Sequence, residues 1–125
     1  MSWIAVDLDG TLAYYHGFLD PYTIGDPIPS MIEEVQKHLR MGVEIRIFTA
    51  RIDSEALRRY REQTGDKQAT PENVVRVIEE WSKKHIGRVL KVTDRKDLET
   101  IAIWDDIAAR VVRNTGKFRA EENKN

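Results

Sequence analysis

The sequence of 125 residues contains no cysteine. Disulfides, zinc–thiolate centres and thiol catalysis are therefore excluded, and the composition does not point to an oxidising compartment. Long apolar runs are also missing: 41% of the residues are hydrophobic and 33% are charged, which is too polar for a membrane-spanning chain. No basic segment precedes Asp7, so we expect no signal peptide and a cytoplasmic location.

An excess of charge of one sign is absent as well. Twenty basic side chains against twenty-one acidic ones give a net charge of -1, without the bulk field of a polynucleotide or acidic-membrane binder. We expect no membrane partner. A local basic strip at Arg58-Arg59-Tyr60-Arg61 leaves nucleic acid open as a partner. The length suits a single domain, which we place at residues 1–115, followed by a polar, flexible tail at 116–125.

The hydrophobic pattern predicts strands that alternate with helices. Residues 12–29 are rich in glycine, proline and aromatic side chains and indicate a long, hairpin-like loop. Ser30 and Glu33 have the spacing of a capping box, which predicts where the first helix begins. The order favours an α/β fold with a mostly parallel sheet flanked by helices, in which ligands bind at the carboxyl ends of the strands. Expected strands are 3–6, 43–48, 88–92, 100–104 and 110–112, and expected helices are 30–41, 53–64 and 70–87.

Two aspartates stand where the first strand ends. Asp7 and Asp9 are two residues apart, so in an extended chain they project to one side and crowd two negative charges, which need a compensating cation. Gly10 permits a tight exit from the strand, and Thr11 adds a hydroxyl. The alternative is a simple Asp-Gly turn with solvated carboxylates.

A second acidic pair, Asp105-Asp106, follows the apolar stretch 101–104. Ends of parallel strands meet at one edge of a sheet, so the two pairs are expected to converge there. Aspartates without histidine or cysteine nearby are hard oxygen ligands that suit magnesium. The alternative for Asp105 and Asp106 is a helix cap or a turn cap.

Thr49 ends the second strand and marks a candidate phosphate site. Its hydroxyl and the backbone N–H groups of Ala50 and Arg51 are of the kind that hold phosphate oxygens. The Arg51 side chain either adds a bidentate cation or pairs with Asp53. Lys96, nine positions before Asp105, would offset the negative charge of aspartate and phosphate. Lys91 competes for that role, although strand alternation favours solvent for its side chain.

Four ordered segments resemble the motifs of the haloacid dehalogenase (HAD) superfamily of phosphohydrolases: Asp7-Leu8-Asp9-Gly10-Thr11, Ile47-Phe48-Thr49, a lysine, and Ile103-Trp104-Asp105-Asp106. The resemblance spans roughly residues 3 to 113, and the chain is similar to the small, capless phosphatases of bacteria and phages. It implies a HAD-like, Rossmann-type domain. The segments 12–29 and 51–70 are too short or too regular for a separate cap domain, so the site should be open.

The resemblance implies a magnesium-dependent phosphomonoester hydrolase that acts on a nucleotide-like or sugar-phosphate substrate. Asp7 would be the nucleophile that forms an aspartyl-phosphate, and Asp9 would carry the proton. The Asp7 and Asp105 carboxylates and the Asp9 backbone carbonyl would hold Mg²⁺, with Asp106 acting directly or through water. Many members carry Gly-Asp-x-x-x-Asp where this chain has adjacent aspartates. Lys96 would stabilise Asp7, and Gly10, Thr49, Ala50 and Arg51 would bind the phosphoryl group.

Two other functions stay open from the sequence. One is a nucleic-acid terminal phosphatase that uses the basic strip, and the other is a non-catalytic module that binds phosphate or a partner. Aromatic side chains of the 12–29 loop would choose the substrate by stacking on a base or sugar, or would instead cover the edge of the sheet. These loop residues are Tyr14, Tyr15, His16, Phe18 and Tyr22, whereas His38 and His85 are expected on helices away from the site.

Overall fold

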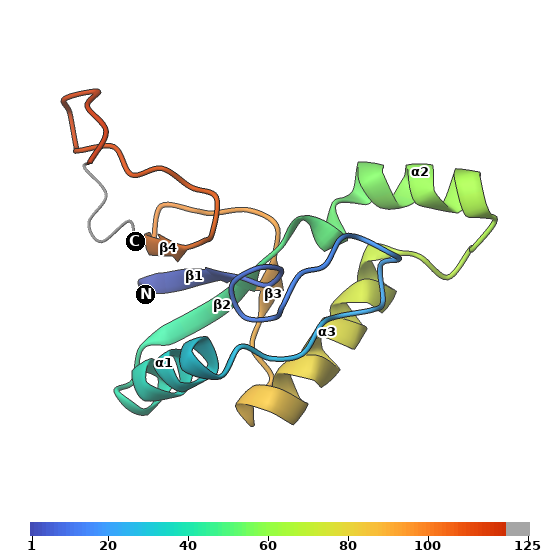
Figure 1. Ribbon diagram of the computed structural model, residues 1–125, viewed down its shortest axis with the longest axis horizontal. Helices are drawn as coiled ribbons and strands as arrows, with labels where there is room; N and C mark the ends of the chain where they lie inside the picture. The colour runs from blue at the N-terminus through green and yellow to red at the C-terminus, as the bar shows by residue number, and fades with distance from the viewer. Residues whose placement is uncertain (120–125) are drawn as a thin grey trace.

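The computed structural model describes residues 1–119, which form an α/β fold around a four-stranded, all-parallel sheet (Figure 1). The predicted α/β class and the parallel sheet are confirmed. No helix in these residues is long and apolar enough to cross a membrane. The strands are β1 (Trp3–Asp7), β2 (Glu44–Phe48), β3 (Val92–Thr93) and β4 (Thr100–Trp104), and the helices are α1 (Pro29–Arg40), the 3-10 turn η1 (Ala50–Ile52), α2 (Ser54–Thr64) and α3 (Pro71–Ile86).

The strand order β3-β2-β1-β4 brings the predicted site residues to one edge. The chain builds the sheet from β1 to β2 and β3 on one side, and then crosses to place β4 on the other side of β1. In the register, Asp7 lies opposite Phe48 of β2, and Val6 lies opposite Trp104 of β4. Thr49 and Asp105, which follow those partners, therefore leave the sheet beside Asp7, at a switch point of the kind where α/β proteins bind ligands.

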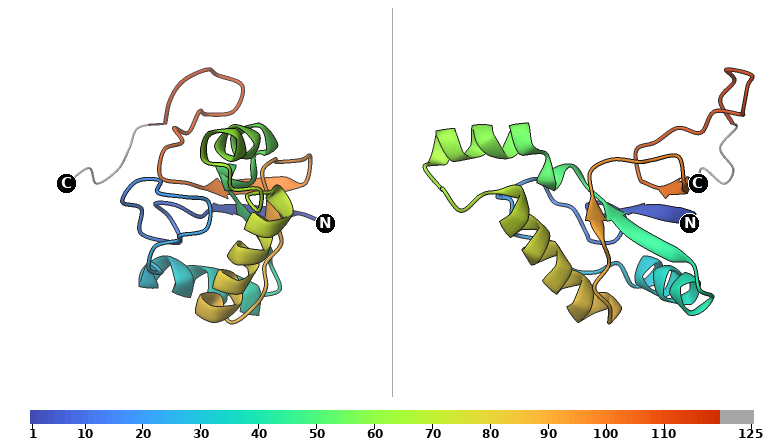
Figure 2. Two further views of the ribbon diagram at one scale, coloured as in Figure 1. Left: turned by 90° about the vertical axis from the view of Figure 1, so that its right-hand side faces the viewer. Right: turned by 180° about the vertical axis from the view of Figure 1, so that it is seen from behind.

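The core lies between the sheet and helices α1 and α3, which cover the same face (Figures 1 and 2). Alternate residues of β1 and β2 point into this core, as the period of a strand requires. Helix α2 lies beyond the carboxyl ends of the strands, apart from α1 and α3 (Figure 2), and contributes Leu57 to the core, with Tyr60 packed partly against it. The buried core residues from the sheet and the two packed helices include Ile4, Val6, Ile45, Ile47, Ile32, Val35, Val74, Ile78, Trp81 and Ile86.

The other face of the sheet is covered at Trp3 by polar side chains. The Arg46 guanidinium lies 4.3 Å from the centroid of the Trp3 ring, and the Trp3 indole N–H donates to Asp97 at 2.9 Å. The hydrogen bond from Trp3, with help from the positive charge of Arg46, lowers the pKa of Asp97. These contacts explain how Trp3 is wholly buried without a helix above it.

The long segment between β1 and α1 is hairpin-like at its base, as predicted. The Tyr14 N–H donates to the carbonyl of Asp26, and the Ile28 N–H donates to that of Leu12. Next to Asp26, on the loop side of these bonds, the Gly25 carbonyl accepts from the Trp81 indole N–H of α3. A Cβ atom at Gly25 would collide with the Tyr14 carbonyl oxygen, so this crossing of two backbones requires glycine.

The third predicted strand, 88–92, is wrong over most of its length, because the chain forms β3 only at Val92–Thr93. Ser82, a wholly buried residue of α3, binds the segment before β3. Its hydroxyl donates to the Arg88 carbonyl and accepts from the Leu90 N–H. These bonds tie residues 88–90 to the end of α3, and the Lys91 carbonyl, which accepts from the Ile47 N–H, already belongs to the ladder with β2.

The fifth predicted strand, 110–112, is also wrong. Val111 forms an isolated antiparallel bridge with Phe118, and the Val112 N–H donates to the Lys117 carbonyl. A turn at Asn114 and Gly116, both at positive φ, folds this segment on itself outside the sheet. The predicted tail at 116–125 therefore begins inside this hairpin, and its residues 120–125 lie outside the described residues.

The capping box predicted for the first helix is not formed. Helix α1 begins at Pro29, with Ile28 as its N-cap and without a side-chain cap bond. The proline has a fixed φ suited to the first turn, and the Ile28 carbonyl accepts from the Met31 and Ile32 N–H groups. Ser30 consequently lies inside the first turn. Helices α2 and α3 do have side-chain caps, Asp53 and Thr70.

Candidate functional site

Three carboxylates converge where β1 and β4 end. Asp7 is the last residue of β1, and Asp105 and Asp106 follow β4 directly. Each offers one oxygen, and these three oxygens lie within 4.8 Å of one another. The predicted meeting of the two acidic motifs is confirmed for these three residues. Asp105 also accepts a hydrogen bond from the Ile107 N–H at 3.1 Å, so its alternative role as a turn cap is present beside the cluster.

Burial and the neighbouring carboxylates raise the pKa of Asp7 to about 7. Burial is the main cause, followed by the negative charge of Asp105 and by a hydrogen bond and negative charge from Asp106, whereas the Leu8 N–H acts in the opposite direction. The like charge around Asp7 thus comes from the second acidic motif, rather than from Asp9 as the spacing in the first motif suggested. An ionised Asp7 needs a cation beside it.

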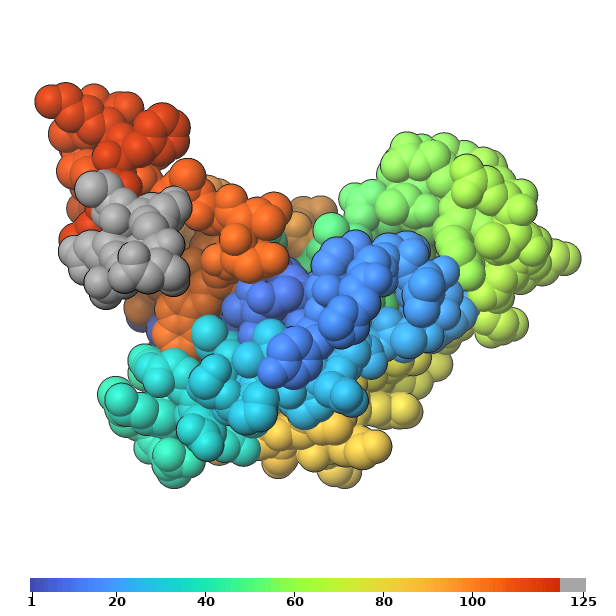
Figure 3. Space-filling view, in the orientation of Figure 1, coloured from blue at the N-terminus to red at the C-terminus, as the bar shows by residue number. Residues whose placement is uncertain are grey.

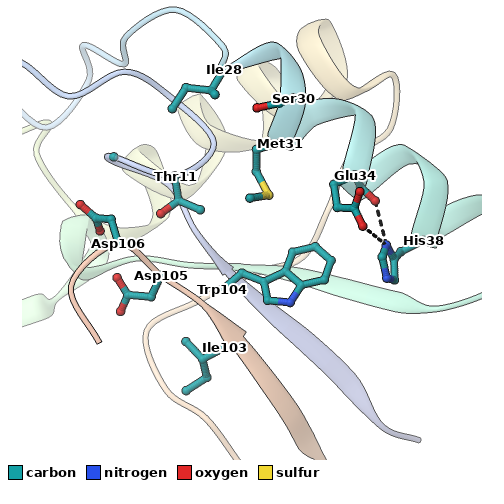
Figure 4. A pocket seen from close by; sticks show the side chains of 11 residues that line it. Thr11, Ile28, Ser30, Met31, Glu34, His38, Ile103, Trp104, Asp105 and Asp106 are labelled. Carbon is teal, nitrogen blue, oxygen red and sulfur yellow. Dashed lines mark hydrogen bonds and ion pairs between the residues drawn. The ribbon is translucent and has the colours of Figure 1, made fainter. Parts of the chain in front are cut away.

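The donor set fits magnesium. All three side chains supply carboxylate oxygens, the hard ligands that Mg²⁺ prefers, and a divalent cation would offset the crowding of charge around Asp7. Thr11 gives a second indication, because its hydroxyl is buried and makes no hydrogen bond within the described chain. In Figure 4 this hydroxyl points to the side on which Asp105 and Asp106 lie. Water bound to a cation is a suitable partner for such a group.

Gly10 lets Asp106 approach the strand end. It has φ of +85°, as the predicted tight exit requires, and a Cβ atom there would overlap the Asp106 carboxylate. Gly10 was predicted to bind phosphate. That role stays a prediction. The structure places Gly10 against the second acidic motif, where any larger residue would push Asp106 away from Asp7.

The Asp9 carboxylate is turned away from the cluster and paired with Arg51. Arg51 Nε and Nη2 donate to the two Asp9 oxygens at 2.8 and 2.9 Å, a bidentate arrangement. The Arg51 side chain is 5% exposed, and its Nη1 also donates to the carbonyls of Asp20 and Pro21. The alternative in which Arg51 pairs with Asp53 is wrong, because Asp53 instead caps α2 by accepting from the Ala56 N–H. The bidentate contact of Arg51 to a phosphate stays a prediction.

Thr49 lies at the end of β2 and is buried next to the turn η1. Its hydroxyl oxygen accepts from the Arg51 backbone N–H at 3.1 Å. That N–H was predicted to hold phosphate, and in this structure it has the Thr49 hydroxyl as its partner. The Thr49 hydroxyl hydrogen remains as a donor toward the cavity that Thr49, Ala50 and Arg51 line.

The two candidate lysines lie outside the cluster. Lys96 is exposed in the loop between β3 and β4 and lines neither of the cavities that contain Asp106. Lys91 is exposed and precedes β3 instead of lying inside a strand. The structure brings neither ammonium to Asp7, and the role proposed for Lys96 stays a prediction.

Two cavities meet at Asp106. The first, of about 730 Å³, lies between β4 and α1, with Asp105 and Asp106 at one end and His38 at the other (Figure 4). His38 bonds the Glu34 carbonyl through Nδ1 and packs edge-on against Trp104. It therefore lies nearer the acidic motif than expected, although its interactions are structural.

The second cavity, of about 470 Å³, contains the groups predicted to handle phosphate, namely Asp7, Asp9, Thr49, Ala50 and Arg51. It lies where the surface is hollowed between α2 and the segment that follows β4 (Figure 3). Sequence reasoning missed the contribution of α2, from which Ala56, Leu57 and Tyr60 line this cavity. Leu57 and Tyr60 are three residues apart and therefore lie on one face of the helix, and this spacing could have indicated that α2 turns an apolar face to the site.

Comparisons with protein-family models, with curated proteins and with solved structures gave no match for this chain. The site is therefore interpreted from its own geometry.

Proposed function

We propose that the protein is a magnesium-dependent phosphomonoester hydrolase of the HAD type that works through an aspartyl-phosphate. The observation that carries the proposal is the cluster of Asp7, Asp105 and Asp106, two of which, Asp7 and Asp106, line a cavity together with Thr49 and Arg51. Oxygen ligands for a hard cation and donors for phosphate oxygens thus share one space. With no cysteine in the chain, we assign this activity to the cytoplasm.

Asp7, Asp105 and Asp106 would hold the cation, with Thr11 as a partner for its water. When bound, magnesium neutralises phosphate charge, so that an anionic nucleophile can approach phosphorus. An Asp7 oxygen then forms a bond to phosphorus while the ester P–O bond breaks, and the leaving oxygen keeps the electron pair and takes a proton. Water attacks the phosphorus next and gives up a proton. The bond to Asp7 breaks, which releases phosphate and restores the carboxylate.

The pairing of Asp9 with Arg51 determines how Asp9 can carry those protons. In the structure both Asp9 oxygens accept from the guanidinium, so the carboxylate must turn from Arg51 to reach a leaving oxygen. Arg51 stays in place because the Asp20 and Pro21 carbonyls also hold it. We assign to the substrate phosphate the role of replacing Asp9 on Arg51, since phosphate forms the same bidentate contacts. Binding would then free the proton carrier.

The terminal-phosphatase alternative has less support. Arg58 of the basic strip pairs with Glu55 and Glu62, and Arg59 lies 3.9 Å from Glu55. Arg61 donates to the Ala69 carbonyl. Arg58 and Arg59 thus lie beside carboxylates, which leaves the charge of Arg61 as the uncompensated one of the strip, and this is little for binding a polynucleotide backbone.

The test is magnesium-dependent phosphate release over nucleotides, sugar phosphates, phosphoamino acids and terminally phosphorylated oligonucleotides. We expect turnover that EDTA removes and that Asp7→Asn and Asp105→Asn abolish. Asp94→Asn is the matched control, since this aspartate lies in the loop beyond β3 and lines neither cavity. During turnover, mass spectrometry should find one hydroxylamine-sensitive phosphoryl group on the peptide that contains Asp7.

A folded protein that binds magnesium but turns over none of these substrates would overturn the phosphatase proposal in favour of the binding module. A phosphatase activity that survives Asp7→Asn would overturn the aspartyl-phosphate mechanism. For oligonucleotide substrates, a steep fall of activity with salt would restore the terminal-phosphatase alternative.

A further inference from the structure

The cavity that contains Asp7 is lined by two kinds of side chain. One set carries the groups that would meet phosphate, namely Asp7, Asp9, Thr49, Arg51 and Asp106. The second set, the aromatic wall, consists of apolar and aromatic side chains from three separate segments. These are Tyr15 and Phe18 of the loop after β1, Ala56, Leu57 and Tyr60 of α2, and Ile107 after β4.

We propose that the aromatic wall binds a planar aromatic ring. The substrate is then a phosphomonoester whose alcohol carries such a ring, as in a nucleoside monophosphate, and not a bare sugar phosphate. The inference rests on the proposed function for the phosphate end. The volume of the whole cavity, about 470 Å³, falls within the usual range for small-molecule sites. Aromatic side chains prefer ring partners in stacked or edge-on contact.

The lining discriminates against a sugar. The aromatic wall consists of six side chains within residues 1–119, and the only polar groups on these six are the hydroxyls of Tyr15 and Tyr60. A sugar placed there would lose hydrogen bonds to water for most of its hydroxyls without replacement. A planar base loses less, because its faces can stack on aromatic rings and only its edges need polar partners.

In the aromatic wall, the part contributed by the loop after β1 is held in place by Arg51. Phe18 is 51% exposed, yet its ring lies 5.5 Å from the guanidinium of the buried Arg51. Arg51 also bonds the carbonyls of Asp20 and Pro21, two and three residues further on. The next aromatic residue, Tyr22, donates its hydroxyl to Asp66 at 2.7 Å. Phe18 is therefore fixed beside the phosphate end by the residue that also contacts Asp9.

Helix α2 holds the residues that it contributes to the aromatic wall, Tyr60 among them, in place. Leu57 is 3% exposed and belongs to the core, so it orients the face of α2 that also carries Tyr60. Tyr60 lies one turn beyond Ala56 and packs partly against the core. Two aromatic side chains from elements distant in sequence thus border one cavity, each anchored by a buried residue next to it.

The experiment compares AMP with ribose 5-phosphate, which share the phosphate ester and the sugar and differ by the base. In the wild type we expect kcat/KM for AMP to exceed that for ribose 5-phosphate by tenfold or more. Phe18→Ala and Tyr60→Ala should each lower this ratio by at least about fivefold. Tyr14→Ala is the matched control, because Tyr14 is a half-exposed aromatic of the same loop outside this cavity, and should change the ratio by less than about twofold.

Calorimetric binding of the same two compounds to Asp7→Asn in magnesium separates this inference from the proposed function. Turnover of both compounds at equal efficiency, with equal affinities, overturns the aromatic site and leaves the phosphatase intact. Tighter binding of AMP that Phe18→Ala removes, without wild-type turnover, supports the aromatic site and overturns the phosphatase. Equal or undetectable binding of both compounds without turnover overturns both.

Discussion

The Arg51 guanidinium holds both carboxylate oxygens of Asp9, at 2.8 and 2.9 Å. The pair joins the loop after β1 to the turn after β2, because Arg51 also bonds two carbonyls of that loop. The arginine is 5% exposed and the aspartate 19%, so little water screens the contact. One side chain therefore connects the phosphate end of the cavity, the candidate proton carrier and the aromatic wall.

Replacement of Arg51 should destabilise the fold. Arg51→Ala leaves Asp9 and two carbonyls without their donor, and we expect a loss of about 3 kcal/mol in the free energy of unfolding, measured with urea. Arg51→Lys should recover only part of this, since an ammonium cannot form the bidentate contact. Arg59→Ala, which removes an exposed contact of 3.9 Å, should change stability by under about 0.5 kcal/mol. Equal values for Arg51→Ala and Arg59→Ala would contradict this account.

The sequence was sufficient for features that depend on local pattern. The strand alternation of β2, the caps Asp53 and Thr70, and the glycine that ends α3 all appear where the residues indicate them. The two acidic motifs could be brought together because parallel strands end at one edge. The pattern could not predict which groups lie together in the folded chain, such as the Ser82 hydroxyl with the backbone of Arg88 and Leu90, or Arg51 with Asp9. Such contacts depend on tertiary packing, which overrides propensity.

The start of α1 offers a direct test of one such failure. Ser30 lies in the first turn, is exposed and makes no cap bond, so Ser30→Ala should change the free energy of unfolding by less than about 0.5 kcal/mol. Thr70 accepts from the Asn73 N–H, and Thr70→Ala should lose about 1 kcal/mol. Urea denaturation of both variants checks the difference. A loss at Ser30 as large as that at Thr70 would show that the capping box forms after all.

The raised pKa of Asp7 predicts how stability depends on pH without metal. The folded state keeps this proton up to about pH 7, whereas the unfolded state releases it near the ordinary value of 3.8. Folding therefore binds a proton between these values, so stability conferred at low pH is lost as the pH rises toward 7. Because Asp7 is only half-buried, we expect the loss to be about 1 kcal/mol, well below the full shift.

Thermal unfolding in EDTA from about pH 5 to about pH 8 measures this effect. The melting temperature should fall with pH in the wild type and fall less in Asp7→Asn, which carries no charge to bury. Magnesium should restore stability at the upper pH in the wild type only. The carboxyls of Asp20 and Asp97, whose pKa values are lowered, act below this window and do not mask it. A rise of stability with pH in EDTA would contradict the assignment.

A comparison of Gly10→Ala with Gly65→Ala distinguishes the effect of backbone strain from the effect of damage to the cation site. Gly10→Ala places a Cβ in a left-handed conformation and against the Asp106 carboxylate, whereas Gly65→Ala meets the same strain, at φ of +75°, in open space. Both should lose about 1 kcal/mol from strain. Only Gly10→Ala should also weaken the magnesium-induced rise in melting temperature, because Asp106 must move away from Asp7. If titration with magnesium gives the two variants the same affinity, Asp106 is not a ligand, and the cation depends on Asp7 and Asp105 alone.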